Sequence, residues 1–264
     1  MTLASFTAAL VAGIVVAPYA AHQAPDTLRV PNWDGRRVPA TLGWALMAGV
    51  VVGTVWFGDR NRETFFGVLA GVLVFFAGLL DDFLGHRTRG LRGHVSSLLR
   101  GRPTTGILKL LVGTGVGIIL ATWLGGGAVR VAASAVVIVL SINLWNVLDV
   151  VPGRALKWGI VVLAAVLPVA LDRPAGALLA AGLGAALGVL PFDLRERSML
   201  GDAGSNPLGL LAGLGLAVAL PTPWLVVAAA AAVVLQVAAE TVTITRIVDG
   251  VPPFRWFDRL GRRS

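Results

Sequence analysis

The chain has 264 residues, of which 56% are hydrophobic and only 14% are charged, and its mean hydropathy is +0.81. This composition is typical of a polytopic membrane protein, because a segment that crosses the bilayer can hold few charges. The absence of cysteine excludes disulfides, thiolate chemistry and cysteine-ligated metal sites. The net charge of +8 does not indicate a nucleic-acid partner, because no soluble basic domain is present and basic residues mark the cytoplasmic loops of membrane proteins.

Nine apolar runs approach the length of about 20 residues that a helix needs to cross a bilayer. They do not alternate apolar and polar residues, as the strands of a membrane barrel do. The sequence therefore predicts an all-α polytopic membrane bundle of about nine transmembrane helices, with residues 1–264 forming a single domain. The predicted spans are 3–21, 40–57, 64–80, 104–124, 129–147, 157–171, 175–192, 206–220 and 223–242.

The distribution of Lys and Arg predicts the orientation of this bundle. With the N-terminus outside, only Arg60, Arg62, Arg130 and Arg173 lie on the outer side, so 18 of the 22 Lys and Arg residues lie inside. Cytoplasmic loops carry such an excess of cations. We therefore expect the N-terminus outside and the C-terminus in the cytoplasm, and on this topology all the acidic motifs described below lie on the cytoplasmic side.

Two adjacent carboxylates, Asp81 and Asp82, end the third predicted span in the motif GLLDDFLG. Two anions held this close resist joint ionisation unless a cation compensates them. A divalent metal is one such cation, and hard oxygen ligands favour magnesium. The alternative is a solvated helix end that faces the arginines of the next loop, and the motif alone leaves both interpretations open.

The loop that follows, residues 86–103, carries five arginines and two histidines. Arginine forks match the geometry of phosphate oxygens, which makes Arg87 and Arg102 candidate substrate contacts. The same loop is also explained by the bias of cations toward the cytoplasm or by contact with anionic lipid. Lys109 lies one turn into the next span, where a buried ammonium group usually has a partner.

Asn143, Asn146 and Asp149 recur at i, i+3 and i+6 at the inner end of the fifth span. On a helix this spacing makes one polar stripe. Polar side chains at this depth are costly when they face lipid, so the stripe should face the protein interior or water. It could bind substrate, or it could form hydrogen bonds between helices.

Asp202 lies in the motif MLGDAGS, after a basic loop. Gly201 and Gly204 free the backbone beside this carboxylate. Ser205 lies where the next helix is expected to begin, and the N-terminus of a helix attracts phosphate. As the third acidic position on the same side of the membrane, Asp202 strengthens the prediction of a metal-diphosphate site.

Four segments together carry a resemblance: GLLDDFLG at 78–85, GRPTTGILKLL at 101–111, NLWNVLD at 143–149 and MLGDAGS at 199–205. In order, spacing and membrane side they resemble the polyprenyl-phosphate N-acetylhexosamine-1-phosphate transferases, relatives of the enzyme that forms lipid I. The chain is similar to a short, divergent member of that family.

The resemblance implies a helical bundle in the bacterial plasma membrane with its active cleft on the cytoplasmic face. It implies transfer of a sugar-1-phosphate from a UDP-sugar to polyprenyl phosphate during cell-envelope glycan synthesis, with release of UMP. The implied cofactor is Mg²⁺, with Mn²⁺ as a substitute, and the implied assembly is a homodimer or a complex with an envelope-assembly protein.

The candidate site follows from these motifs. The expected catalytic carboxylates are Asp81, Asp82, Asp149 and Asp202. Among them, Asp202 is the expected principal metal ligand, with Asp82 or Asp149 sharing the metal. The expected substrate contacts are Lys109, Asn143, Asn146, Arg87, Arg102 and Ser205.

The chain also departs from the family pattern. Residues 149–153 read Asp-Val-Val-Pro-Gly where the family usually has Asp-Gly-x-Asp-Gly, so Pro152 replaces the second acid. The His-rich inner loop and a tenth span are missing, and we expect Arg246, Arg255 and Arg259 of the tail to replace the histidines. The departures leave two alternatives to an active enzyme, which are a degenerate scaffold or regulator of envelope assembly and a lipid or solute carrier.

Overall fold

The computed structural model describes residues 2–32, 35–58, 61–84, 97, 100–101, 104–241 and 244–262. Within this part of the chain, a helix covers each of the nine predicted apolar runs, so the all-α bundle is confirmed. These helices are α1 (Thr2–His22), α2 (Leu42–Phe57), α3 (Arg62–Leu84), α5 (Thr105–Leu124), α6 (Ala128–Leu148), α7 (Arg154–Ala170), α8 (Gly176–Leu194), α9 (Asp202–Ala219) and α10 (Thr222–Thr241).

Six of the described helices are long and apolar enough to cross a membrane, namely α1, α3, α5, α6, α8 and α10. Helix α2 is apolar but has only 16 residues. Helices α7 and α9 do not meet the same length and hydropathy requirement. The chain is therefore a multi-pass membrane protein, while the count of nine spans and the orientation of the termini stay predictions.

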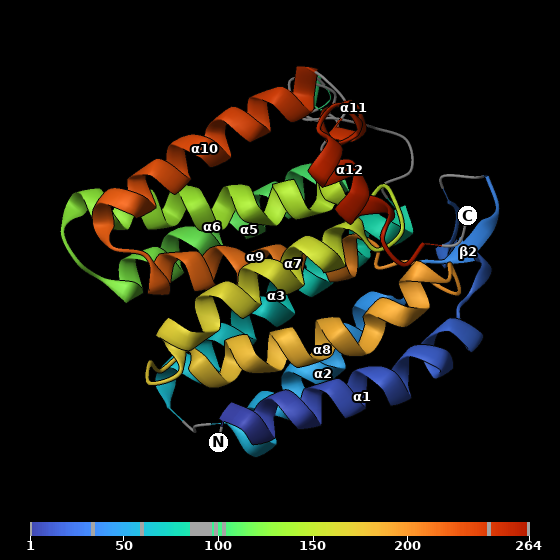
Figure 1. Cartoon of the computed structure of the whole chain (residues 1–264), viewed down its shortest axis with the longest axis horizontal. Coiled ribbons are helices and arrows are strands. Elements are labelled where there is room, and N and C mark those ends of the chain that lie inside the picture. The colour runs from blue at the N-terminus through green and yellow to red at the C-terminus, as the bar shows by residue number, and fades with distance from the viewer. Residues whose placement is uncertain are drawn as a thin grey trace.

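Small residues let the helices of one side of the bundle approach closely. Helix α1 packs against α2 and α8, and the three lie together along the lower side of Figure 1. A Cβ atom on Gly184 would lie 2.2 Å from the carbonyl oxygen of Phe6, and one on Gly188 would lie 2.6 Å from that of Leu10. These two glycines, one turn apart on α8, therefore bring its backbone against that of α1.

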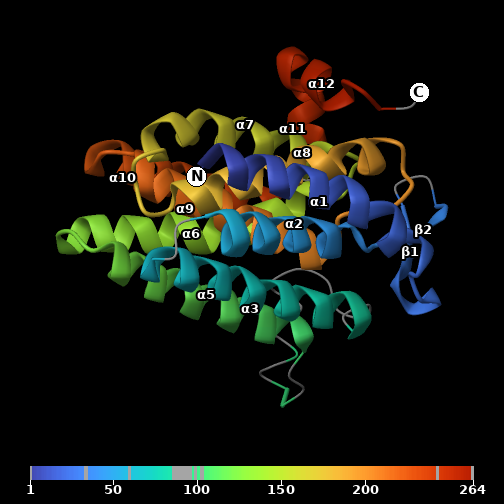
Figure 2. The same ribbon diagram turned by 90° about the horizontal axis from the view of Figure 1, so that it is seen from below.

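Helix α9 forms the centre of the bundle. It packs against α3, α6 and α7, and most of its residues are buried (Figure 2). Its first residue is Asp202, so the sequence that begins this central helix also places a carboxylate among the ends of the surrounding helices.

A short hairpin supports the segment that leads into α9. Strands β1 (Arg29–Pro31) and β2 (Arg37–Pro39) are antiparallel, with Val30 opposite Val38. The carbonyl oxygen of Pro39 accepts hydrogen bonds from Ser198 Oγ at 2.8 Å and from the backbone N–H of Met199 at 2.7 Å. The hairpin thus fixes the chain three residues before Asp202.

The hairpin, α11 (Ile244–Gly250) and α12 (Pro252–Arg259) all lie at one end of the bundle, toward the right of Figure 1. The C-terminal ends of α3, α6, α8 and α10 and the N-terminal ends of α5, α7 and α9 lie at this same end. We call it the acidic end, because the predicted acids are carried there.

Candidate active site

An ammonium group bridges two carboxylates at the acidic end. Lys109 Nζ lies 3.0 Å from Asp81 Oδ2 and 2.5 Å from Asp202 Oδ2. The other oxygen of Asp81 accepts a hydrogen bond from Thr105 Oγ1 at 2.5 Å. Because Thr105 and Lys109 lie one turn apart on α5, that helix presents two donors to the same carboxylate. Helices α3, α5 and α9 are therefore joined by one ion cluster.

Asp82 reaches the same place by a different route. Its Oδ1 accepts a hydrogen bond from the backbone N–H of Asp202 and its Oδ2 accepts one from that of Ala203, both at 2.9 Å. Asp82 thus satisfies two of the backbone donors that the start of a helix leaves unpaired. Gly201 allows this approach, because its φ of +68° is accessible to glycine and a Cβ there would lie 3.0 Å from Asp82 Oδ2.

The paired acids therefore have different surroundings. Asp81 faces the ammonium of Lys109, and Asp82 holds the backbone that carries Asp202. The start of α9, where the sequence suggested phosphate, has two of its N–H groups occupied by Asp82.

The two asparagines of the stripe form hydrogen bonds with different helices, Asn146 with α9 and Asn143 with α10. Asn146 Nδ2 donates to Asp202 Oδ1 at 2.5 Å and lies 3.4 Å from Asn206 Oδ1 on α9. Asn143 Nδ2 donates to Gln236 Oε1 on α10 at 2.8 Å. Both asparagines thus make the hydrogen bonds between helices that were one alternative for the stripe. Only Asn146 contacts a carboxylate of the ion cluster.

Asp149 follows the end of α6 and lies partly buried. Withdrawal from water raises its pKa well above the usual range, and the charges of Asp193, Asp202 and Asp82 raise it further. A hydrogen bond from the backbone of Gly201 acts in the opposite direction. Asp149 therefore belongs to the same group of carboxylates, on the side of α6 that faces the start of α9.

The other predicted site residues make none of these contacts among the described residues. The Ser205 hydroxyl group is fully buried in α9 and has no hydrogen-bond partner among the described residues. Arg87 and Arg102 lie outside the described residues. Arg246, Arg255 and Arg259 are exposed at the acidic end. Their expected part in nucleotide binding stays a prediction.

The turn after Asp149 is held by residues that the motifs did not indicate. The backbone N–H of Gly153 donates to Asp193 Oδ2 at 2.7 Å, and Arg262 Nε donates to the carbonyl oxygen of Pro152 at 3.0 Å. Where the family pattern has a second acid, this chain therefore has a turn fixed by α8 and by the tail. No local signal indicated these partners, because they lie 40 and 110 residues away in the sequence.

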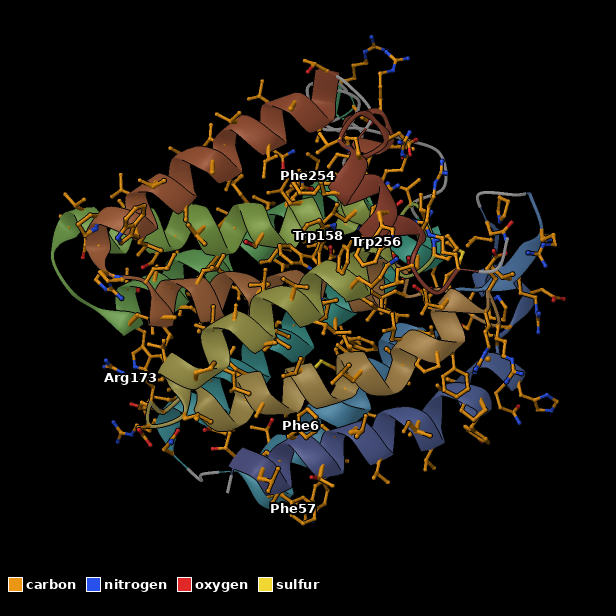
Figure 3. The ribbon with its side chains drawn as sticks, viewed as in Figure 1. Phe6, Phe57, Trp158, Arg173, Phe254 and Trp256 are labelled. Atoms are coloured by element: carbon orange, nitrogen blue, oxygen red, sulfur yellow. The ribbon has the colours of Figure 1, made fainter. Side chains whose placement is uncertain are left out.

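Aromatic rings complete the docking of the tail. Trp158 of α7 makes edge-to-face contacts with Phe254 and Phe257 of α12, with ring centroids 5.7 and 5.1 Å apart. Figure 3 shows Trp158 beside Phe254, with Trp256 further along α12. Helix α12 is thus packed onto α7 close to the site.

The carboxylate oxygens at the acidic end suit a magnesium ion that is also coordinated by a substrate. Among the residues that the structure describes, no three His, Asp or Glu side chains form a metal-binding group. Asp81 and Asp202 nevertheless approach one cation from two sides, as their contacts with Lys109 show. Mg²⁺ is commonly held by one or two carboxylates, and phosphate oxygens and water complete its shell. The pair suits that arrangement better than a cage built from protein alone.

Comparison with known proteins identifies the family. The family model for glycosyl transferase family 4 matches residues 64–220, more than half of the chain. The chain belongs to glycosyl transferase family 4. Its members transfer sugar phosphates to polyprenyl phosphate, and the resemblance drawn from the four motifs is thereby confirmed. A search of curated proteins found no significant match.

The glycosyl transferase family 4 match runs from α3 to the end of α9. It contains the whole ion cluster, both asparagines of the stripe and Asp149. Helices α10, α11 and α12 lie beyond it, so the contacts of Gln236 and of the tail belong to the part of this family member that the match does not cover.

Proposed function

We propose that the protein transfers a sugar-1-phosphate from a UDP-sugar to polyprenyl phosphate at the cytoplasmic face of the bacterial plasma membrane, with release of UMP. The observation that carries this proposal is the bridge of Lys109 between Asp81 and Asp202, at the start of a helix that Asp82 holds in place. It gathers positive charge and oxygen ligands at one end of a membrane bundle, as a diphosphate substrate requires.

In the proposed reaction an oxygen of the polyprenyl phosphate attacks the phosphorus that carries the sugar. The bond from that phosphorus to the oxygen bridging the two phosphates of the UDP-sugar breaks, and UMP leaves with that oxygen. The attacking phosphate is a monoester with a second pKa of about 6, so it is already mostly dianionic near neutral pH. Catalysis therefore needs alignment and neutralisation of charge more than a strong base.

The side chains of the site divide these tasks. Lys109 supplies positive charge next to the reacting phosphates. Asp81 orients this ammonium through the 3.0 Å contact, and Asp82 positions Asp202 through the start of α9. Asn146 fixes the rotation of the Asp202 carboxylate through its hydrogen bond to Oδ1.

Asp202 is the proposed principal ligand of Mg²⁺, with Asp81 and Asp149 as the further carboxylates of the same group. When bound, the ion would supply additional positive charge to a diphosphate. Asp82 was expected to share the metal. Because both of its oxygens accept backbone hydrogen bonds, we propose for it the positioning of Asp202 instead.

The test is release of UMP by purified protein supplied with polyprenyl phosphate, MgCl₂ and each member of a UDP-sugar panel. We expect turnover with one or a few UDP-sugars and none when the lipid phosphate or magnesium is left out. Lys109→Met, which removes the bridging charge, should abolish it. This panel also identifies the sugar.

A scaffold in envelope assembly is the second candidate function. It is favoured by the turn at Pro152, which replaces an acid of the family pattern and is held by Arg262. A folded, monodisperse wild-type protein that turns over no UDP-sugar would favour this candidate. The partner would then be sought by crosslinking from exposed residues of α12.

A further inference from the structure

A small cavity lies beside the ion cluster, between α5, α6, α9 and α10. Its volume is about 90 Å³, enough for several waters. Its polar lining comes from Lys109, Thr114, Asn143, Asn206 and Gln236. We call this cavity the amide recess. The bundle carries these side chains on four different helices, so the recess exists only because the helices meet there.

A hydrogen-bond donor without a partner distinguishes the amide recess. Gln236 Nε2 is buried and has no partner among the described residues. Asn206 Nδ2 is also buried and without a partner among them, but it lies against α3, 2.8 Å from the position that a Cβ atom on Gly78 would take. The oxygens of the same two side chains are used, since Gln236 Oε1 accepts from Asn143 and Asn206 Oδ1 accepts from Asn146. An unpaired donor away from water costs free energy that a bound acceptor would recover.

Lys109 contributes a further donor. An ammonium group has three N–H bonds, and Lys109 directs two contacts at Asp81 and Asp202. Lys109 also lines the recess, where the third N–H can donate to a ligand. The recess therefore combines a cation with an amide donor, which suits a phosphate oxygen and not a cation.

The depth of the amide recess indicates how such a ligand arrives. Gln236 lies five residues before the end of α10 at Thr241, and Asn143 lies five residues before the end of α6 at Leu148. At 1.5 Å per residue, the recess lies roughly 7 Å inside the helix ends. A ligand held there lies beside the apolar parts of α6 and α10 as well as beside Lys109, as suits a phosphate group attached to a lipid tail.

The sides of the recess are suited to a lipid tail. Helix α6 packs against both α5 and α10, and α10 diverges from α6 toward its C-terminal end (Figure 1). The residues of α10 that flank Gln236 face outward, with Val234 66% and Val237 59% exposed, and Leu111 of α5 is 66% exposed. Exposed apolar side chains therefore border the recess, whose few polar groups lie in an otherwise apolar lining.

We propose that the amide recess binds the phosphate monoester of the acceptor lipid, with Gln236 as a direct hydrogen-bond donor to it and Asn143 orienting Gln236. This inference rests on the proposed transfer to polyprenyl phosphate and adds a residue that lies outside the family match. Gln236 thereby contributes to the affinity for the lipid and not to that for the UDP-sugar.

Gln236→Glu is the matched variant. It keeps the shape and the oxygen that accepts from Asn143, while it removes the N–H donors and adds an oxygen that repels phosphate. We expect the KM for polyprenyl phosphate to rise roughly 10-fold or more, the scale of a lost hydrogen bond to a charged group. The KM for the UDP-sugar should change less than about twofold, because that substrate does not contact Gln236. Val227→Leu, an exposed change nine residues earlier on the same helix, should alter neither value.

A second measurement does not depend on turnover. The lipid phosphate retained by the purified protein is counted by native mass spectrometry after incubation with polyprenyl phosphate, and in a parallel sample with inorganic phosphate. Wild type and Val227→Leu should retain the lipid, and Gln236→Glu should lose most of it. Gln236→Leu, which lacks the donors without adding charge, gives the same comparison if the Glu variant fails to fold.

The outcomes separate the two proposals. An inactive wild-type protein that retains lipid phosphate through Gln236 would refute the transfer and support the recess. Equal retention of the lipid by wild type, Gln236→Glu and Gln236→Leu, or retention by none of them, would overturn the proposed lipid-phosphate site. Equal changes in the KM for polyprenyl phosphate and in the KM for the UDP-sugar would overturn it too. Displacement of the lipid by inorganic phosphate at comparable concentration would assign the recess to free phosphate and overturn the lipid assignment.

Discussion

Arg154 and Asp258 form a two-point ion pair across 104 residues of sequence, with Nε 2.8 Å from Oδ1 and Nη2 2.9 Å from Oδ2. Both side chains are buried, at 1% and 3% exposure. Arg262 adds a second guanidinium at 2.6 Å from Asp258, and Lys157 donates to the carbonyl oxygens at the end of α12. This buried group of charges attaches the tail to the start of α7, five residues after Asp149.

Asp258→Ala should release the tail from the bundle. Removing one partner leaves the guanidinium groups of Arg154 and Arg262 buried without an anion, which costs roughly 3–5 kcal/mol. We expect hydrogen exchange in α11 and α12 to lose its protection, and protease cleavage after the exposed Arg255 to become fast. Helices in the family match should keep their protection.

Asp172→Ala, an exposed change at the opposite end of the bundle, is the control for this variant and should leave the tail protected. Replacing both partners, as in Arg154→Met with Asp258→Leu, should restore part of the loss, because Arg154 then no longer leaves an unpaired buried charge, although Arg262 still lacks its anion. Equal protection of the tail in wild type and Asp258→Ala would contradict the anchoring role.

The part of the tail docking that depends on Asp258 should fail only in acid. Burial by itself would raise the pKa of Asp258, but the hydrogen bonds and charge of Arg154 and the charge of Arg262 lower it below the usual value of 3.8. A carboxylate with a lowered pKa stabilises the folded state above its unfolded pKa, and this stabilisation is lost as the pH falls through the folded value. We expect the contribution of Asp258 to the protection of the tail to be constant from pH 5 to 8 and to be lost below about pH 4.

Asp258→Asn is the control for the pH series. It cannot titrate, so any remaining protection of its tail should not change between pH 5 and pH 3 by this mechanism. A wild-type tail that detached near pH 6 would instead assign the transition to a different group and would contradict the part given to Asp258.

The helices, and the position of Asp81, Lys109 and Asp202 at the same end of the bundle, were predicted from the sequence, because the lengths and order of the apolar runs set which helix ends lie together. The contacts of Lys109 with both carboxylates were not predicted, since Lys109 was expected only as a substrate contact. The parts that were not predicted depend on side-chain direction and on long-range pairing. Asp82 was predicted to bind the metal beside Asp81. Because adjacent residues of a helix point in different directions, its carboxylate instead accepts hydrogen bonds from the backbone of α9.

Gln236 and Asn206 were not predicted as site residues. Both lie in predominantly apolar helices, and only the assembled bundle shows that their amides border the same cavity. The Arg154–Asp258 pair was not predicted either. The two residues are 104 positions apart in the sequence, and only the folded tail brings them together.

Gly201→Ala should weaken the site without direct loss of a polar group. Gly201 has φ of +68° and ψ of 174°, a backbone region that is nearly restricted to glycine and costs other residues about 1–3 kcal/mol. The new Cβ would also press on Asp82 Oδ2 at 3.0 Å. We expect a lower thermal unfolding temperature and slower UMP release, both measured on detergent-purified protein.

Gly127→Ala tests whether any glycine gives the same result. Gly127 has φ of −69° and no heavy atom within 4 Å of the position a Cβ would take. It should leave both the unfolding temperature and the turnover near those of wild type. Similar losses in the two variants would show that the strain at Gly201 is not the cause.

The orientation can be tested with the two ends of α8. The chain has no cysteine, so Arg195→Cys and Asp172→Cys each introduce a single thiol at an exposed position. In intact cells a membrane-impermeant maleimide should label Asp172→Cys only, and disruption of the membrane should expose Arg195→Cys. The reverse pattern would place the acidic end outside and would contradict the positive-inside argument.

Asp202→Asn should remove activity while the fold survives. The amide keeps an oxygen that can accept from Asn146, and Asp81 remains to pair with Lys109, so the ion cluster loses one charge but no helix contact. The loss of the anion removes the principal proposed metal ligand, which should lower turnover at least ~10²-fold, the scale of one preorganised transition-state contact.

The same chemical change at Asp26, whose side chain is 98% exposed on the hairpin side of the acidic end, provides the control. Asp26→Asn should release UMP at the wild-type rate, and both variants should be monodisperse with similar unfolding temperatures. Raising the magnesium concentration should not restore Asp202→Asn, because the missing group is a ligand and not merely a part of the surface charge. Turnover by Asp202→Asn within a fewfold of wild type would refute the magnesium assignment and shift the search for ligands to Asp81 and Asp149.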